Sequence, residues 1–163
     1  MKICIFGNKT TTKALLNELI KKKVKVSCLV ALDISNSKKA KISGHDDDLI
    51  SFATSHGVSI FSPESYSLSS RKDIDFFQRR RFDLGLCTGW QRLIPPSTVD
   101  SFEHGVYGWH GSGFEFPNGR GRSPLNWSLR LGSTKIYHNL FRYAHGADDG
   151  MIYETEIFII CLK

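Results

Sequence analysis

The amino-acid sequence predicts an α/β fold, a mostly parallel twisted sheet flanked by helices. Short, continuously apolar runs such as 2–7 (KICIFG) are typical of buried parallel strands. Segments with apolar residues at helical spacing lie between these runs, for example over 13–23. Strand and helix alternate along most of the chain, and this is the order that parallel βαβ units require.

Polar residues mark the starts of two expected helices in the first half of the chain. Thr10 to Thr12 offer hydroxyls that can cap the first helix, and Lys21 to Lys23 form its solvated end. Asp46 to Asp48 begin a later helix; we interpret these carboxylates as partners of the helix dipole rather than as a metal site. The expected elements are strand 2–7, helix 13–23, strand 24–32, polar loop 33–44, helix 46–55, strand 58–61 and a weak helix 71–80.

Proline marks the helix starts in the second half. The segment 95–103 reads as a short helix entered through proline, and Pro124 stands in the first turn of the last helix. Trp109 and Trp127 are expected in the core. The expected elements are strand 82–88, helix 95–103, strand 105–110, helix 124–131 and strands 136–143 and 151–160.

Composition bounds the class of protein. A chain of 163 residues, 40% hydrophobic and 12% aromatic, can bury a core, and the simplest organisation is a single domain over residues 1–163. The net charge of +6 favours anionic partners such as phosphates or nucleotides. Because the basic residues are scattered in small groups, no nucleic-acid partner is expected.

The cysteines and the N-terminus indicate a cellular compartment. Cys4, Cys28, Cys87 and Cys161 lie far apart without a CxxC pair, which argues against a disulfide framework and a structural metal site. The chain shows neither a secretory leader nor an apolar run of membrane-spanning length. We therefore expect a cytoplasmic protein that binds no metal and no membrane.

Two long loops are the candidate site. In an open α/β sheet, ligands bind beyond the carboxyl ends of the strands. The first such loop, FGNKTTT, lacks GxGxxG, so a nicotinamide dinucleotide has little support. The loops CTGWQRLIPP and HGSGFEFPNGRGRSP are longer and unusual in composition, and the second is rich in glycine. His110 is the first residue of the second loop. Asp148, in the segment GADDG between the last two strands, can lie at the same edge of the sheet and serve as the carboxylate partner of His110.

These segments resemble a known family. HGSGFEFPNGRGRSPLNWSLRLG followed by GADDG is similar to the catalytic domain of folate-dependent formyltransferases. The HGS start and the GRGRSPLNW run look most like the branch that formylates amino groups on nucleotide-linked sugars. The resemblance implies a Rossmann-like formyltransferase fold over residues 1–160, with its most specific part over 105–153.

The resemblance also implies a reaction and a set of site residues. A formyl group would pass from 10-formyltetrahydrofolate to a primary amine, with His110 and Asp148 as the catalytic pair and Asp149 as the lesser candidate. The loop 86–93 would hold the pterin ring, and the substrate's phosphates or the folate tail would contact polar side chains. The implied folate-binding residues are Leu86, Cys87, Thr88, Gly89, Trp90 and Leu93, and the implied substrate residues are Ser112, Arg120 and Arg122.

The sequence departs from the family pattern at one catalytic position. The family's Asn-x-His reads Gly108-Trp109-His110 here, so the amide that donates to the oxyanion is absent. Removing one such donor costs roughly 10²- to 10³-fold in rate. Three explanations are open. A neighbouring amide or a water replaces the missing donor, or the protein binds its ligands without turnover. The candidate amides are Asn118, Asn126 and Asn139.

The C-terminal strand suggests a shortened family member. Family domains generally continue into further helices, whereas this chain ends with IFIICLK, so we expect exposed apolar surface and a homodimer. Three alternatives to a sugar N-formyltransferase stay open. They are an inactive module that binds folate or a nucleotide sugar, a glycinamide ribonucleotide formyltransferase, and a methionyl-tRNA formyltransferase.

Overall fold

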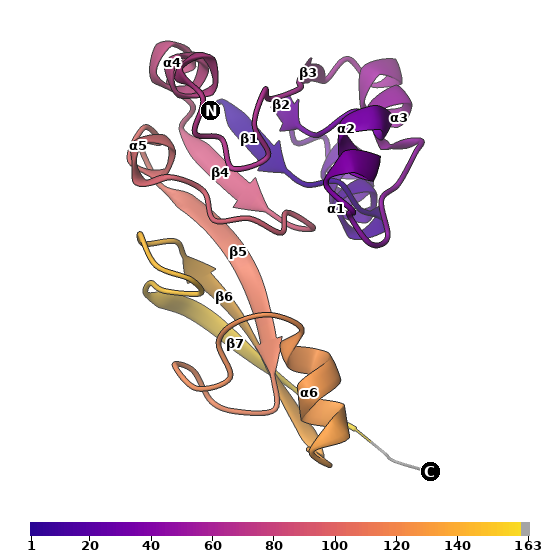
Figure 1. Ribbon diagram of the computed structural model, residues 1–163, viewed down its shortest axis with the longest axis vertical. Helices are drawn as coiled ribbons and strands as arrows, with labels where there is room; N and C mark the ends of the chain where they lie inside the picture. Colours follow the sequence, from indigo (N-terminus) through magenta and orange to yellow (C-terminus); the bar gives the residue numbers. More distant parts are fainter. Residues whose placement is uncertain (161–163) are drawn as a thin grey trace. The chain divides into compact units, whose positions relative to one another are not determined.

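The computed structural model describes residues 1–160, which form two compact units that divide after Val106 (Figure 1). The helices are α1 (Thr10–Lys21), α2 (Ile34–Lys39), α3 (Leu49–Ser55), α4 (Arg71–Arg80), α5 (Pro96–Val99) and α6 (Pro124–Arg130). The strands are β1 (Ile3–Phe6), β2 (Val26–Val30), β3 (Ser59–Phe61), β4 (Leu84–Cys87), β5 (Val106–Ser112), β6 (Lys135–Arg142) and β7 (Ile152–Ile159). Over residues 1–160, no helix is long and apolar enough to cross a membrane.

The first unit is built on four parallel strands in the order β3-β2-β1-β4. Every residue of β1 is buried, as a strand covered on both faces requires. Successive side chains alternate between the faces, so Ile5 and Phe6 enter different clusters. Figure 1 shows α1, α2 and α3 on one side of these strands and α4 and α5 on the other.

The cores on the two faces differ in chemistry. On the Ile5 face, Leu16 of α1 and Leu49 of α3 pack in an aliphatic cluster. On the Phe6 face, the Phe77 ring of α4 stacks on Phe6 with the ring centroids 5.5 Å apart, and Phe102 lies 5.8 Å from Phe6. Offset and tilted rings of this kind are the arrangements that aromatic quadrupoles favour.

The second unit is an antiparallel ladder, with β6 between β5 and β7. Directly opposite residues on β5 and β6 share a face, so His110 stands beside Asn139 and Gly108 beside Phe141. The loop after β5 crosses this face, where Gly119 abuts Ser112. Helix α6 contacts the other face, where a Leu125 methyl carbon lies 3.4 Å from the Cβ position of Gly111.

Two expectations about the helices of the first unit are wrong. Helix α1 begins at Thr10 rather than at residue 13, because Lys9 is its N-cap residue and Thr12 lies inside the first turn. The Thr12 hydroxyl accepts from the Lys9 amide and donates to the Thr88 carbonyl at 2.6 Å. The loop expected over 33–44 contains α2, which Asp33 starts by accepting a hydrogen bond from the Asn36 amide.

The aspartate triplet also acts differently from the expectation. Helix α3 begins at Leu49, and the Asp48 side chain makes no capping hydrogen bond. The carboxylate of Asp46 accepts from the Asp48 amide and lies 3.7 Å from the Lys13 ammonium. The triplet therefore shapes the turn before α3 and pairs with a cation of α1.

The expectation for Trp127 is wrong, and α5 is shorter than the predicted helix 95–103. The Trp127 side chain is 54% exposed, because α6 presents only part of its surface to the sheet and Ser128 is its buried residue. Trp109 is half-buried on β5. The strands over 136–143 and 151–160 are confirmed within one residue at each end.

Candidate functional site

His110 lies near the end of β5 with its ring almost fully enclosed. Its side chain is 5% exposed, and its Nε2 atom lies 2.7 Å from the carbonyl oxygen of Gly119 in the following loop. The Phe116 ring stands edge-on to the imidazole, with the ring centroids 6.3 Å apart. The loop therefore folds back over the histidine that precedes it.

Asp148 supplies the second polar contact of this histidine. Its Oδ2 atom lies 3.5 Å from Nδ1 of His110 and accepts a hydrogen bond of 2.7 Å from the Gly121 amide. Asp148 has a left-handed backbone, with φ of 45°, which Asp tolerates better than most side chains. The turn between β6 and β7 thus brings the carboxylate to the loop that carries Gly121.

Both ring nitrogens of His110 face oxygen atoms, and only the imidazolium form can donate to both. Burial lowers the pKa of His110, but the contacts with Asp148 and the Gly119 carbonyl outweigh it and hold this pKa above the ordinary value. Burial raises the pKa of Asp148, but its contacts with His110 and the Gly121 amide outweigh it and hold this pKa below the ordinary value. The two groups therefore favour a charged pair.

Asp149 has a different partner from Asp148. Its carboxylate lies 3.4 Å from the guanidinium of Arg120, which also stands over the Phe116 ring at 5.0 Å from the centroid. Arg122 is exposed in the same loop. Ser112 is buried, and its hydroxyl accepts a hydrogen bond from the Phe114 amide.

The Gly108 position is covered by an aromatic ring. A Cβ atom built on Gly108 would lie 2.5 Å from both the Oη and a ring carbon of Tyr143. Real Cβ atoms essentially never approach a neighbour so closely. Tyr143 follows β6 directly and stacks on Phe141, with the ring centroids 5.0 Å apart. The space that a side chain at 108 would need therefore belongs to Tyr143.

The structure separates the three candidate amides. Asn139 is buried opposite His110, but its Oδ1 accepts a hydrogen bond of 2.7 Å from the Thr155 hydroxyl. Its Nδ2 donates weakly to the Tyr137 carbonyl at 3.4 Å. Asn118 and Asn126 are exposed, in the loop and on α6.

The predicted folate loop, residues 86–93, lies in the first unit. Cys87 is buried in β4, and Trp90 is buried against Tyr66 with the ring centroids 4.7 Å apart. Gly89 has a positive φ of 77°, which glycine adopts without strain. Leu93 is 59% exposed. Leu86, Thr88 and Gly89 are partly exposed. The loop thus offers backbone groups and one apolar side chain to a ligand, while Trp90 anchors it.

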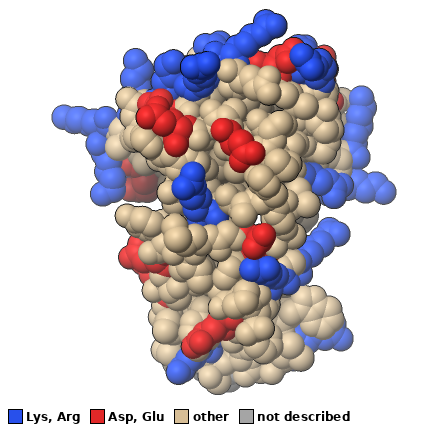
Figure 2. Space-filling model, turned by 90° about the vertical axis from the view of Figure 1, so that its left-hand side faces the viewer, with Lys and Arg blue, Asp and Glu red and all other residues tan. Residues whose placement is uncertain are grey.

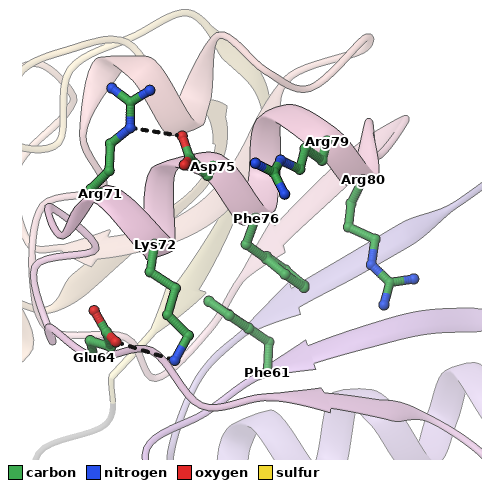
Figure 3. Close-up of a pocket in the computed structure, with 8 residues that line it drawn as sticks. All are labelled: Phe61, Glu64, Arg71, Lys72, Asp75, Phe76, Arg79 and Arg80. Carbon is green, nitrogen blue, oxygen red and sulfur yellow. Dashed lines mark hydrogen bonds and ion pairs between the residues drawn. The ribbon is translucent and has the colours of Figure 1, made fainter.

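A separate cavity of about 630 Å³ lies between α4 and the β3 edge in the first unit (Figure 3). Its stacked Phe61 and Phe76 rings lie 3.6 Å apart. Two of its cations are neutralised, since Arg71 pairs with Asp75 and Lys72 with Glu64 (Figure 3). None of its lining residues was singled out by the sequence. Figure 2 shows cationic side chains spread over the visible face with acidic side chains among them.

Sequence reasoning missed three contacts of this site. They are the Gly119 carbonyl on His110, the Gly121 amide on Asp148 and the Tyr143 ring over Gly108. The glycines of NGRGR were visible signals of a tight loop, because positive φ at Gly119 and Gly121 lets the backbone turn towards the histidine. No sequence signal marked Tyr143.

The chain is similar to known formyltransferases along its length. The family described as formyl transferase matches residues 1–161. Methionyl-tRNA formyltransferase of Mycoplasma genitalium is 26% identical over 161 residues, which are 98% of this chain and 49% of that protein. The chain therefore spans about half the length of this relative.

Two solved structures share the fold. Phosphoribosylglycinamide formyltransferase from Bacillus halodurans has a TM-score of 0.76 at 16% identity, and the match covers 98% of this chain and 80% of the Bacillus halodurans chain. A sugar N-formyltransferase from Shewanella has a TM-score of 0.67 at 14% identity, and the match covers 99% of this chain and 58% of the Shewanella chain. The predicted α/β formyltransferase fold is confirmed. Because the family match covers nearly the whole chain, the protein belongs to the formyl transferase family.

Proposed function

We propose that this protein is an N-formyltransferase that moves a formyl group from 10-formyltetrahydrofolate to a primary amine. The observation that carries the proposal is the His110–Asp148 pair in a chain of the formyl transferase family. A buried imidazole held by a carboxylate suits proton transfer and stabilisation of developing negative charge. The proposal treats residues 1–163 as one catalytic domain.

The reaction exchanges one carbon–nitrogen bond for another. The neutral acceptor amine attacks the formyl carbon, and the carbonyl oxygen becomes an oxyanion. The bond between the formyl carbon and folate N10 then breaks. The acceptor nitrogen loses one proton and N10 gains one, so the products are a formamide and tetrahydrofolate. The protein must therefore stabilise one negative charge and move one proton.

The protonated His110 is the group that faces the oxyanion in this proposal. Its Nδ1 stays with Asp148, while Nε2 exchanges the Gly119 carbonyl for the formyl oxygen. This exchange keeps the number of hydrogen bonds constant and opens the loop over the ring. Asp148 holds the imidazolium and a water that removes the proton from the amine.

The donor would be held by the loop 86–93. Gly89 is partly exposed, so its backbone suits the polar edge of a pterin ring, and the exposed Leu93 suits the apolar face of the ring. The backbone of Thr88, which pairs with Phe6 and Thr12, holds the start of this loop. Residues 86–93 contain no cluster of thiol or carboxylate side chains, so this loop fits an organic heterocycle better than a metal ion. Leu86, Cys87 and Trp90 support the loop from the buried side.

The acceptor that we propose is a nucleotide-linked amino sugar. The HGSG and GRGRSPLNW segments support it, because they resemble the sugar N-formyltransferase branch. Arg122 is exposed and can pair with a phosphate, and Arg120 is exposed as well and would exchange Asp149 for a phosphate. Ser112, the last residue of β5, abuts Gly119 of the loop that carries both arginines. Methionyl-tRNA is the second candidate acceptor, favoured by the 26% identity to the Mycoplasma genitalium enzyme.

The proposal includes a cytoplasmic location and a homodimer. The spacing of the cysteines without CxxC supports a reducing compartment. The exposed apolar side chains of β7, among them Ile157 and Phe158, support self-association. The opposing hypothesis is an inactive module that binds folate or a nucleotide sugar, and the loss of the family's asparagine at Gly108 favours it.

Calorimetric titration with 5-formyltetrahydrofolate tests the donor site without any assumption about the acceptor. We expect saturable binding. The chain should then be incubated with 10-formyltetrahydrofolate and, in turn, nucleotide-linked amino sugars, glycinamide ribonucleotide and methionyl-tRNA, with tetrahydrofolate release as the readout. Binding without turnover for any acceptor would favour the inactive module, and no binding would refute the proposal.

A further inference from the structure

We infer that the hydroxyl of Tyr143 donates a hydrogen bond to the formyl oxygen as it becomes an oxyanion, in place of the amide that Gly108 lacks. This inference rests on the proposed function. Its basis is the position of Tyr143, whose Oη lies 2.5 Å from the point where a side chain at residue 108 would begin.

The ladder geometry puts this position on the face that carries His110. Residues 108 and 110 are two apart on β5, so their side chains point to the same side of the sheet. Because the Tyr143 hydroxyl covers the Cβ position of Gly108, it lies on that same side. An asparagine at 108 would start from this point, and Tyr143 reaches it from the end of β6 instead.

A continuous row of rings fixes the tyrosine relative to the histidine. Tyr143 stacks on Phe141, Phe141 lies 5.7 Å from Phe116, and Phe116 lies 6.3 Å from His110, measured between ring centroids. Phe141 is buried and stands directly opposite Gly108 in the β5–β6 register. A donor held by packed rings is preorganised, and preorganisation is what gives an oxyanion donor its effect.

The glycine and the tyrosine therefore form a complementary pair. Any residue at 108 other than glycine would overlap the Tyr143 ring, whereas glycine leaves room for it. A phenolic hydroxyl carries one proton that it can donate to an oxyanion. The Tyr143 hydroxyl therefore stands at the point from which the missing amide side chain would start.

The test compares kcat and KM of the full chain with 10-formyltetrahydrofolate and the acceptor identified by the incubations above. Tyr143→Phe removes the hydroxyl and keeps the ring, so we expect kcat to fall about 10²-fold and KM for the donor to change by no more than about twofold. Tyr153→Phe is the matched control, because Tyr153 is 73% exposed on β7, and it should keep the wild-type kcat.

A second pair of variants separates chemistry from packing. Gly108→Asn alone should lose activity and lower Tm, because the new side chain overlaps Tyr143. Gly108→Asn combined with Tyr143→Ala makes room for the amide and should exceed the kcat of Tyr143→Ala alone by about tenfold or more.

The outcomes distinguish the two proposals. An active wild type whose Tyr143→Phe variant keeps kcat within about twofold would overturn the role of Tyr143 while leaving formyl transfer intact. A wild type that transfers formyl to none of the acceptors would overturn both proposals.

Discussion

At the scale of single residues, the site depends on which oxygen atoms face the two nitrogens of His110. Asp148 faces Nδ1 and the Gly119 carbonyl faces Nε2, so the ring is stabilised as an imidazolium. The neighbouring Asp149 is directed to Arg120 instead. Two adjacent carboxylates with the same chemistry thus acquire different partners.

Asp148→Asn should abolish most formyl transfer while preserving the fold. Asn tolerates the left-handed backbone at this position and can still accept from the Gly121 amide, so Tm should change little. The imidazolium loses its charged partner, and we expect kcat to fall about 10²- to 10⁴-fold. Steady-state kinetics and thermal unfolding check this. Asp149→Asn is the matched variant, and equal losses in both would contradict the assignment of Asp148.

His110→Gln should reveal the charged pair in the pH dependence of stability. The stability that His110 gains from its raised pKa is present below its unfolded pKa and is lost as pH rises through the folded value. The contribution of Asp148, whose pKa is lowered, is lost as pH falls through its folded value. The free energy of unfolding of the wild type should therefore exceed that of the variant most between about pH 3.9 and 6.5, the ordinary pKa values of Asp and His. Denaturant unfolding measures this difference, and a difference independent of pH would exclude the pair.

At the scale of elements, the glycine-rich loop is held by α6 on one side and by β5 on the other. The Ser128 hydroxyl accepts from the Gly113 amide at 2.6 Å and donates to the Pro124 carbonyl at 2.7 Å. Gly119 abuts Ser112 and turns its carbonyl to His110. The loop that covers the histidine is therefore held to α6 at its start and to β5 and His110 at its middle.

Ser128→Ala should loosen this attachment. Ser128 is buried, and removal of its hydroxyl leaves the Gly113 amide without its acceptor, at a cost of about 1–3 kcal/mol. Chemical denaturation should show the loss, and hydrogen exchange at Gly113 should accelerate. Ser51→Ala on the exposed surface of α3 is the control and should cost less than about 0.5 kcal/mol. A Ser128→Ala chain as stable as the control would rule out this tie.

At the scale of the whole molecule, the last described strand is exposed on both of its faces. All eight residues of β7 are exposed, and β6 is its paired neighbour. Ile157, Phe158 and Ile159 are 52–65% exposed, an apolar content that strands at sheet edges usually avoid. The apolar side chains of β7 thus form a surface suited to association.

Self-association should depend on this edge. Sedimentation velocity should show the mean mass rising with protein concentration, and Phe158→Lys should shift the chain towards the monomer. Ile34→Lys on α2 is the control, because Ile34 is exposed to a similar extent but lies in the first unit. A monomer at every concentration would overturn the proposed homodimer.

The sequence by itself determined the α/β order, the position of nearly every strand and the family. These follow from local patterns, because apolar runs, helical spacing and proline at helix starts act over a few residues. It also pointed to His110 and Asp148 as a pair. The prediction was wrong at the starts of α1 and α2, which the N-cap residues Lys9 and Asp33 set. It was also wrong for Trp127, because that side chain lies on the exposed part of α6.

Only the tertiary structure decided which groups meet at the site. The choice of Asp148 over Asp149, the Gly119 carbonyl on His110 and the ring of Tyr143 over Gly108 depend on strand register and on turns with positive φ. Such contacts join residues 9 to 38 positions apart. Spacing along the chain does not encode them, because they arise where the ladder and the returning loops bring side chains onto one face.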